Sequence, residues 1–299
     1  MNWLLLTAIV CTFGFFKDLR PSEAYLTSYL TGVWKNLTVE EVDNEVYPWW
    51  TYSYLLWLIP VFLLTDFLRY KPMLVIDGIA YIATWALLLW AQGIPLMKLM
   101  QVVYGLATAA EIGYYSYLFA KVSPDRYKQI ASFTKAASLG GKFAAYLAGQ
   151  LLISFEVLNF FHLNIFSFVS VCIAFLITII LPKAEHSEIF HRKKEKESGN
   201  DVTNDSNDIT DDRSGSKIKN GFIFLWKELK SIYSRKETVL WSIWWALASC
   251  GNFQVGNYIQ NMWKVISPNR KSAKIYNGAV EAAAGLFGKF HVYLHVFLK

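Results

Sequence analysis

Carboxylate side chains interrupt two strongly apolar segments of this sequence. Glu111 lies among small residues just before a pair of tyrosines, and Glu281 lies in an equally apolar stretch near the carboxyl end. Burying an ionised group in such surroundings is costly and usually serves a function. A carboxylate beside aromatic rings suits an organic cation, because the charge and the ring faces both attract it. For Glu111, a structural ion pair with Lys135 or Lys142 is an equally open alternative.

Polar and aromatic residues in other apolar segments are candidates for the same site. Asn257 lies within residues 240–263, and Trp50 and Trp85 lie in two earlier segments. A tryptophan in such a segment more often packs or marks a membrane interface than binds a ligand. The first segment is interrupted by four charged residues, and a water-filled cavity or a charge network would accommodate that break. These four are Lys17, Asp18, Arg20 and Glu23.

Asp66 and Arg69 are oppositely charged residues at the end of an apolar segment. Transporters that rock between two states use such pairs to close the inner end of their pathway. An ordinary loop on the inner side of a membrane would carry the same residues, so both interpretations stay open.

No arrangement typical of catalysis is recognisable. The sequence lacks a nucleophile motif, a phosphate-binding loop, metal-ligand spacing and a pair of catalytic carboxylates, so we expect no enzyme activity and no cofactor. The net charge of +6 is modest and informative mainly through its placement, so we expect no nucleic-acid partner.

The composition points to a membrane. Hydrophobic residues make up 54% of the 299 and charged residues 17%, against about a quarter in soluble domains. We therefore expect an all-α, polytopic protein whose surroundings are membrane lipid. A span needs about 20 mostly apolar residues. The apolar segments predict helices near 3–31 with a break at 17–21, and near 49–67, 72–92, 96–119, 128–154, 160–181 and 240–263, with another beginning near 275.

Charge placement orients these spans. The 66–72 and 121–128 loops carry basic residues, whereas the 33–48 loop is acidic. The positive-inside rule then predicts a cytoplasmic N-terminus. Asn36 begins an Asn-Leu-Thr glycosylation sequon on the predicted outer face, which agrees with this orientation.

The charge pattern also divides the chain. Residues 1–182 form a half with six spans, and residues 240–299 begin a second half. Residues 183–239 form a cytoplasmic loop, which we expect to be partly disordered because its mixed charges cannot support a core. Residues 222–233 place apolar side chains on one helical face beside basic ones, which predicts an interfacial helix there.

Several short stretches together resemble the reduced folate carrier family, whose animal members carry folates or thiamine. The resemblance implies the major facilitator architecture, with twelve helices in two halves joined by a long cytoplasmic loop. It also implies a plasma-membrane carrier that works by alternating access. The stretches are Phe13–Phe16, Arg20–Glu23, Trp50–Leu55, Thr65–Pro72, Val122–Pro124 and Tyr276–Ala282.

The sequence looks more similar to the thiamine carriers than to the folate carriers. Glu111 stands where the folate carrier has an arginine, which suits a cationic substrate. The resemblance implies that aromatic rings hold the vitamin's heterocycles, that polar groups bind its aminopyrimidine, and that Glu111 supplies negative potential. The implied substrate residues are Trp50, Trp85, Tyr104, Asn257 and Glu281.

Two positions depart from the thiamine pattern. Gln101 replaces a pocket glutamate, and Lys142 replaces a pocket tyrosine. Lys142 pairs with Glu111 or tunes the pocket for an anion. A carrier for folate or another anionic vitamin is therefore the alternative, favoured if Lys142 and Lys135 dominate the pocket.

The carboxyl end departs more strongly. After Gly288 the sequence loses the family's character and ends at Lys299. We expect a chain truncated relative to the family, so a truncated isoform that does not transport is a second alternative.

Overall fold

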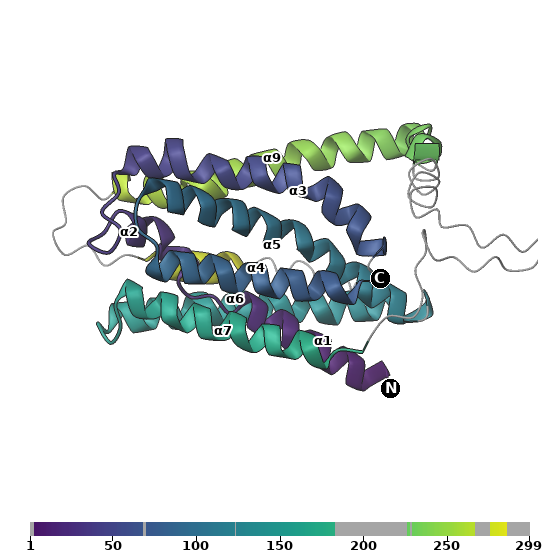
Figure 1. Cartoon of the computed structure of the whole chain (residues 1–299), viewed down its shortest axis with the longest axis horizontal. Coiled ribbons are helices and arrows are strands. Elements are labelled where there is room, and N and C mark those ends of the chain that lie inside the picture. The colour runs from purple at the N-terminus through teal and green to yellow at the C-terminus, as the bar shows by residue number, and fades with distance from the viewer. Residues whose placement is uncertain are drawn as a thin grey trace, which may run out of the picture.

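The computed structural model describes residues 3–67, 70–122, 124–182, 226–227, 229–266 and 276–285. Within these residues every regular element is a helix, and no strand occurs. The long helices lie side by side along one common direction (Figure 1). The N-terminus and the beginning of α9 lie at one end of this bundle, and α2 lies at the other. The predicted all-α class is confirmed.

The first predicted span is broken as expected. Helix α1, Trp3–Asp18, ends before Pro21, and the chain resumes as the short helix α2, Leu26–Leu30. A proline lacks the N–H that a helix interior needs, and it disfavours a helical conformation for the residue before it. A single 3₁₀ turn, Glu23–Tyr25, joins the two pieces.

Three helices form one side of the bundle. α3 spans Tyr47–Phe67, α4 spans Lys71–Trp90 and α5 spans Ile94–Lys121. α5 packs against both α3 and α4. A π-helical turn, Glu41–Val46, leads directly into α3.

The other side contains α6, Tyr127–Ser154, and α7, Phe160–Ile180. A 3₁₀ turn, Pro124–Arg126, precedes α6. α1 packs against both α6 and α7, and α4 also contacts α7. The close approach of α1 to α6 needs a glycine, because a Cβ on Gly141 would overlap the carbonyl oxygen of Phe15.

Beyond the polar segment the chain forms α9, Lys236–Ile266, and a further helical stretch over residues 277–285. α9 begins slightly before the predicted residue 240. Of the predicted interfacial helix, residues 226–227 and 229–233 are helical with exposed side chains. Residues 183–225 and 228 lie outside the described residues.

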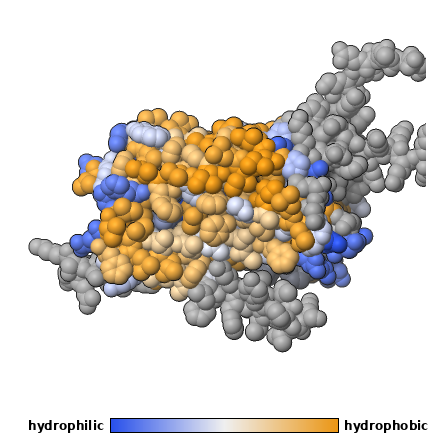
Figure 2. Space-filling model, turned by 90° about the horizontal axis from the view of Figure 1, so that it is seen from below, coloured by the Kyte–Doolittle hydropathy of each residue, from blue (hydrophilic) through white to orange (hydrophobic). Residues whose placement is uncertain are grey.

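The outer surface of the bundle is apolar. Figure 2 shows hydrophobic side chains covering the middle of one face, with hydrophilic ones gathered toward both ends. By length and composition, two of the described helices, α4 and α7, are apolar enough to cross a membrane. Leu176 and Ile180 of α7 are more than half exposed, which suits contact with lipid.

Candidate functional site

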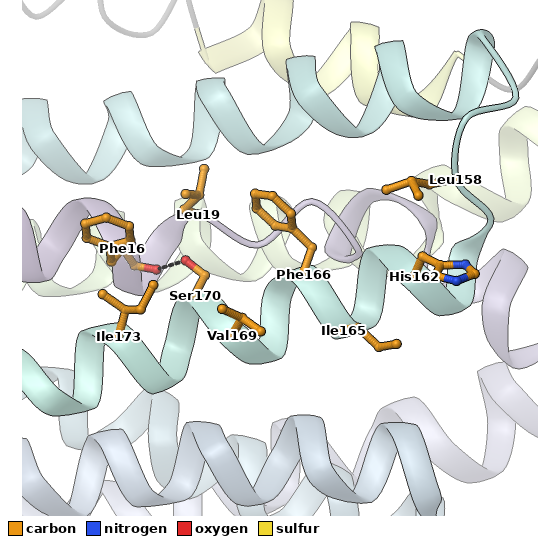
Figure 3. A pocket seen from close by; sticks show the side chains of 9 residues that line it. All are labelled: Phe16, Leu19, Leu158, His162, Ile165, Phe166, Val169, Ser170 and Ile173. Atoms are coloured by element: carbon orange, nitrogen blue, oxygen red, sulfur yellow. Dashed lines mark hydrogen bonds between the residues drawn. The ribbon is translucent and has the colours of Figure 1, made fainter.

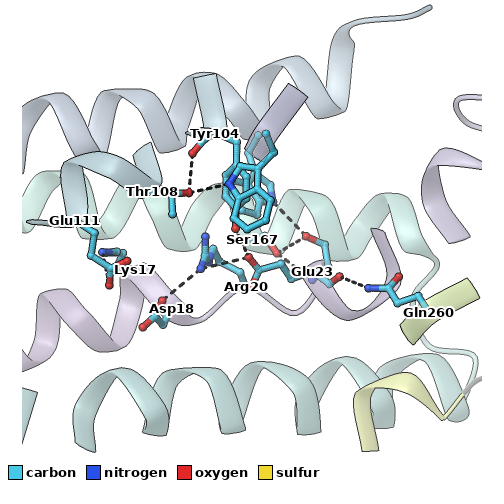
Figure 4. Close-up of polar contacts among 12 residues, drawn as sticks. Lys17, Asp18, Arg20, Glu23, Tyr104, Thr108, Glu111, Ser167 and Gln260 are labelled. Atoms are coloured by element: carbon cyan, nitrogen blue, oxygen red, sulfur yellow. Dashed lines mark hydrogen bonds and ion pairs between the residues drawn. The ribbon is translucent and has the colours of Figure 1, made fainter. Parts of the chain in front are cut away.

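The break after α1 holds a network of charged side chains. Arg20 lies 3.3 Å from Asp18 and 3.3 Å from Glu23, measured from its Nη2 to the nearest carboxylate oxygens (Figure 4). Arg20 and Asp18 are buried, whereas Glu23 is about one-fifth exposed. The charge network expected at this break is therefore present.

Aromatic rings cover this network. The guanidinium carbon of Arg20 lies 4.9 Å from the ring centroid of Tyr81 and 5.3 Å from that of Trp85. The indole of Trp85 donates a hydrogen bond of 3.2 Å to the Ser22 hydroxyl. That hydroxyl donates in turn to Ser167 of α7. Trp85 is thus a buried ring held over a cation.

Tyr104 joins the rings to the charges. Its hydroxyl donates a hydrogen bond of 2.7 Å to Oε1 of Glu23. Its ring centroid lies 6.1 Å from that of Trp50 and 6.2 Å from that of Trp85. The Trp50 indole donates to the hydroxyl of Thr108. The structure therefore brings Trp50, Trp85 and Tyr104 into one cluster.

The ion pair of Glu111 differs from both expected alternatives. Its Oε1 lies 3.3 Å from Nζ of Lys17, and the same ammonium lies 3.9 Å from Oδ2 of Asp77. The expected partners were Lys135 and Lys142, but the last turn of α1 brings Lys17 closer. Lys135 is exposed on α6.

Lys142 lies close enough to two carboxylates for its charge to act on them. It interacts electrostatically with Glu111 and with Glu281. The charge of Glu23 also acts on Glu281. Lys142 and Glu281 are both half-buried. These interactions connect α5, α6 and the helical stretch 277–285.

That stretch is docked on the break in α1. Asn277 donates a hydrogen bond of 3.3 Å to the carbonyl of Ala24, and the Ala279 amide donates one of 3.0 Å to Gln150. A side chain at Gly278 would collide with Tyr25 and Tyr146, so glycine permits this close contact.

One face of α9 turns toward the same region. Phe253 meets the Trp50 ring edge-on with centroids 5.5 Å apart. Gln260 donates to the carbonyl of Glu23, and Asn261 donates to the carboxylate of Asp43. Residues spaced by three, four or seven share a helix face, so Asn257 lies on the face that these contacts define. Asn257 itself is half-buried.

The remaining predicted residues lie outside the charge network and the aromatic cluster, or outside the described residues. Gln101 is buried on α5, and its carbonyl accepts a hydrogen bond from Ser53. Asn36 is exposed in the loop after α2. Asp66 lies in the last turn of α3, and Arg69 lies outside the described residues. The proposed gating pair therefore stays a prediction.

Sequence reasoning missed two members of the site. Asp77 lies fully buried in α4, and Tyr81 lies one turn further along the same helix. An acidic residue inside the apolar segment 73–90 was the available signal, because a carboxylate at such a position needs a partner.

The connected charges are unequal in number. Three cations, Lys17, Arg20 and Lys142, face five carboxylates. With every group in its usual ionised form, this set has a net charge of −2. The five carboxylates belong to Asp18, Glu23, Asp77, Glu111 and Glu281.

A separate apolar groove lies between α1 and α7 (Figure 3). It has a volume of about 440 Å³ and is lined almost wholly by carbon, with His162 at one end. Phe16 of α1 and Leu19, directly after α1, line it, and none of the connected charged residues does. We assign it no part in the site.

Comparison with known proteins gives one consistent result. The family model "Reduced folate carrier" matches residues 1–299. Human thiamine transporter 2 is 39% identical over 96% of this chain, and human thiamine transporter 1 is 38% identical over 99%. Folate transporter 1 of Caenorhabditis elegans is 40% identical over 97% of the chain. The chain spans 64% to 66% of the length of these relatives.

Proposed function

We propose that this chain, which belongs to the reduced folate carrier family, forms the vitamin-binding helices of a membrane carrier. The vitamin that the site suits best is thiamine. Such a carrier moves its solute without converting it, as the names of the related transporters indicate for those proteins.

The excess of carboxylates around an aromatic cluster carries this proposal. Thiamine has a permanent positive charge on one of two aromatic heterocycles. A site with five carboxylates and three cations favours such a solute over a folate, whose glutamate tail is anionic. Ring faces attract the same cation.

The geometry supports a proposed role for each of these residues. Trp50 and Tyr104, with rings 6.1 Å apart, are the rings proposed to hold the heterocycles, and Trp85 supports Tyr104 from the side. Glu111 supplies the accessible negative charge. Asn257 and Glu281 are proposed to bind the aminopyrimidine from the side of α9 and the 277–285 stretch. Gln101 is uncharged and contacts α3 through Ser53, and we propose no direct contact between it and the vitamin.

A carrier for an anionic vitamin is the second candidate. The charge of Lys142 acts on both Glu111 and Glu281, so it offsets part of the negative potential. The relative named Folate transporter 1 is as similar to this chain as the thiamine transporters are. Under this alternative Lys142, with Lys135, would attract the substrate.

The contacts of α9 fit one state of an alternating-access cycle. Phe253, Gln260 and Asn261 contact the first half of the chain near α2. We propose that the end near α2 is the closed outer end. The other end, where Asp66 and Arg69 would close the pathway, then opens to the cytoplasm.

The proposed placement in the membrane completes this assignment. The chain sits in the plasma membrane with a cytoplasmic N-terminus, residues 1–182 as the first half and residues 240–299 as the start of the second. Residues 183–239 form the cytoplasmic connection. Asn36 then faces outward, at the end of the bundle that carries α2.

Uptake of labelled thiamine by cells that make this chain tests the proposal. We expect saturable uptake that unlabelled thiamine blocks and folate does not, and that Glu111→Gln reduces at least about tenfold, as loss of a buried charge contact would. Lys128→Gln, at an exposed residue of the neighbouring helix α6, is the matched control and should change little. Uptake blocked by folate and indifferent to Glu111→Gln would favour the anionic alternative.

A further inference from the structure

We propose that Lys17 is a tethered counter-cation, which holds Glu111 in the empty site and moves to Asp77 when a substrate cation takes its place. This inference rests on the proposed function, since it requires a cationic solute. It makes Lys17 a positioning residue that sets how tightly the cation binds and how readily it leaves.

The position of Lys17 between two carboxylates is the first observation. Its ammonium lies 3.3 Å from Glu111 and 3.9 Å from Asp77. Both carboxylates are therefore within reach of one flexible side chain, and the exchange needs rotation about its terminal bonds only. In the described structure its Nζ makes no hydrogen bond of good geometry to either of them. The ammonium is held by charge and is not locked in one place.

The two carboxylates differ in accessibility. The side chain of Glu111 is 36% exposed, whereas that of Asp77 is 0% exposed and that of Lys17 is 3% exposed. A solute can therefore reach Glu111 but cannot reach Asp77. Because the buried Lys17 forms an ion pair with Glu111, an arriving cation must compete with Lys17 for the carboxylate.

Asp77 offers the displaced ammonium a destination. Neither of its carboxylate oxygens has a hydrogen-bond partner among the described residues. A buried charge without hydrogen bonds is unfavourable, so a closer approach of the Lys17 ammonium would stabilise the Asp77 carboxylate. This stabilisation offsets the loss of the ion pair between Lys17 and Glu111. The substrate charge and the lysine charge are then neutralised together.

Aromatic rings flank the ammonium on its way. Nζ of Lys17 lies 5.6 Å from the ring centroid of Tyr81 and 5.5 Å from that of Tyr114. Ring faces attract a cation without fixing its direction, so they stabilise the lysine in either position. Lys17 also lies in the last turn of α1, where the helix dipole favours a positive charge.

Equilibrium binding of labelled thiamine to the purified full chain in lipid nanodiscs tests this inference. Lys17→Met removes the competing charge but keeps the length of the side chain. We expect it to tighten thiamine binding about 3- to 10-fold, the range that removal of a competing ion pair allows. In a Glu111→Gln background the same change should have no effect. Lys128→Met, at an exposed lysine of α6, is the control and should leave the affinity unchanged.

Asp77→Asn is a second and independent variant, and it remains informative if Lys17→Met does not fold. Without the buried carboxylate, Lys17 has no alternative partner and stays on Glu111. Thiamine should then bind about threefold more weakly, again in the range of one ion-pair interaction. An unchanged or tighter affinity in Asp77→Asn would overturn the inference.

The outcomes separate the inference from the function on which it rests. Thiamine binding that is unaltered or weakened in folded Lys17→Met overturns the role of Lys17 and leaves the carrier assignment intact. Binding seen in Lys17→Met and absent from the natural chain supports the counter-cation. Binding of folate but not thiamine to both proteins overturns the assignment and the inference together.

Discussion

Tyr104 and Glu23 are joined by a hydrogen bond of 2.7 Å from the tyrosine hydroxyl to the carboxylate oxygen Oε1. The same oxygen lies 3.3 Å from the guanidinium of Arg20. One carboxylate of the broken first helix thus links an aromatic ring of α5 to the buried cation. The position of the ring and the local charge therefore depend on each other.

Tyr104→Phe should weaken thiamine binding about 3- to 10-fold. The ring and its contacts remain, but Glu23 loses a charged hydrogen bond and the ring loses the contact that fixes its position, an indirect effect on the bound vitamin. Tyr117→Phe is a matched control on the same helix, since it loses a hydrogen bond of 2.9 Å to Pro182 that lies outside the charge network. Equal effects of the two changes would contradict a special role for Tyr104.

The contact between Asp43 and Asn261 should act as part of an outer gate. Nδ2 of Asn261 lies 2.6 Å from both oxygens of Asp43. With cysteines at both positions and Cys11, Cys172 and Cys250 replaced, a short reducible bis-methanethiosulfonate should link the pair and stop uptake. Reductant should restore it. The single variant Asp43→Cys is the control, and continued uptake by the cross-linked chain would refute the gate.

The crossing of α1 and α6 should depend on Gly141. A methyl group there would overlap the carbonyl oxygen of Phe15, so Gly141→Ala should lower the free energy of unfolding by about 1–3 kcal/mol. The neighbouring Gly140 has no other atom closer than 3.9 Å to an added Cβ. Gly140→Ala should therefore be neutral or stabilising by up to about 1 kcal/mol, because alanine favours a helix. Thermal unfolding of both variants in detergent measures the difference.

The loop between α2 and α3 should lose stability in acid. Two hydrogen bonds from Thr38, of its amide and its hydroxyl, lower the pKa of Glu41 below its ordinary value of 4.5. The contribution of Glu41 to folding is therefore complete above 4.5 and is lost as the pH falls through the lower folded-state value. The melting-temperature difference between the natural chain and Glu41→Gln should shrink over that range. Glu40→Gln, at the adjacent exposed carboxylate, is the control for the substitution itself.

Asn36 should carry a glycan if the loop after α2 faces outward. Its φ of 53° is left-handed, a conformation that aspartate tolerates better than most residues, so Asn36→Asp removes the acceptor with little strain. Gel mobility should increase for Asn36→Asp and Thr38→Ala and stay unchanged for Thr38→Ser. Thr38→Ala should also lower the melting temperature, because Thr38 bonds Glu41. Unaltered mobility in Asn36→Asp would argue against an outward loop.

The helices could be predicted from sequence because their apolar runs are long. α3, Tyr47–Phe67, and α7, Phe160–Ile180, lie within two residues of the expected bounds. The break near Pro21 was equally clear, since a proline has a direct local effect on a helix. Trp50 and Trp85 were candidates from the sequence itself, whereas Tyr104 came only from the family resemblance.

The partner of Glu111 could not be predicted, because it depends on which helices are neighbours in space. The sequence suggested Lys135 and Lys142 on the following helix, because position along the chain does not show that the end of α1 lies beside Glu111. The short segment before the break brings Lys17 beside Glu111 and Asp77, and only the three-dimensional arrangement of α1, α4 and α5 reveals this. Asp66 and Arg69 stay untested as a pair.

The inequality of charges in the site has a consequence for its response to voltage. A group of residues with a net charge of −2 feels the membrane potential differently when it is empty and when it holds a cation. Moving one elementary charge across 100 mV is worth about 2.3 kcal/mol. A bound cation changes the net charge of this set from −2 to −1, so a negative cell interior opposes inward movement of the loaded site less than that of the empty site. This dependence on the membrane potential comes from the five carboxylates of the site, which exceed its three cations in number.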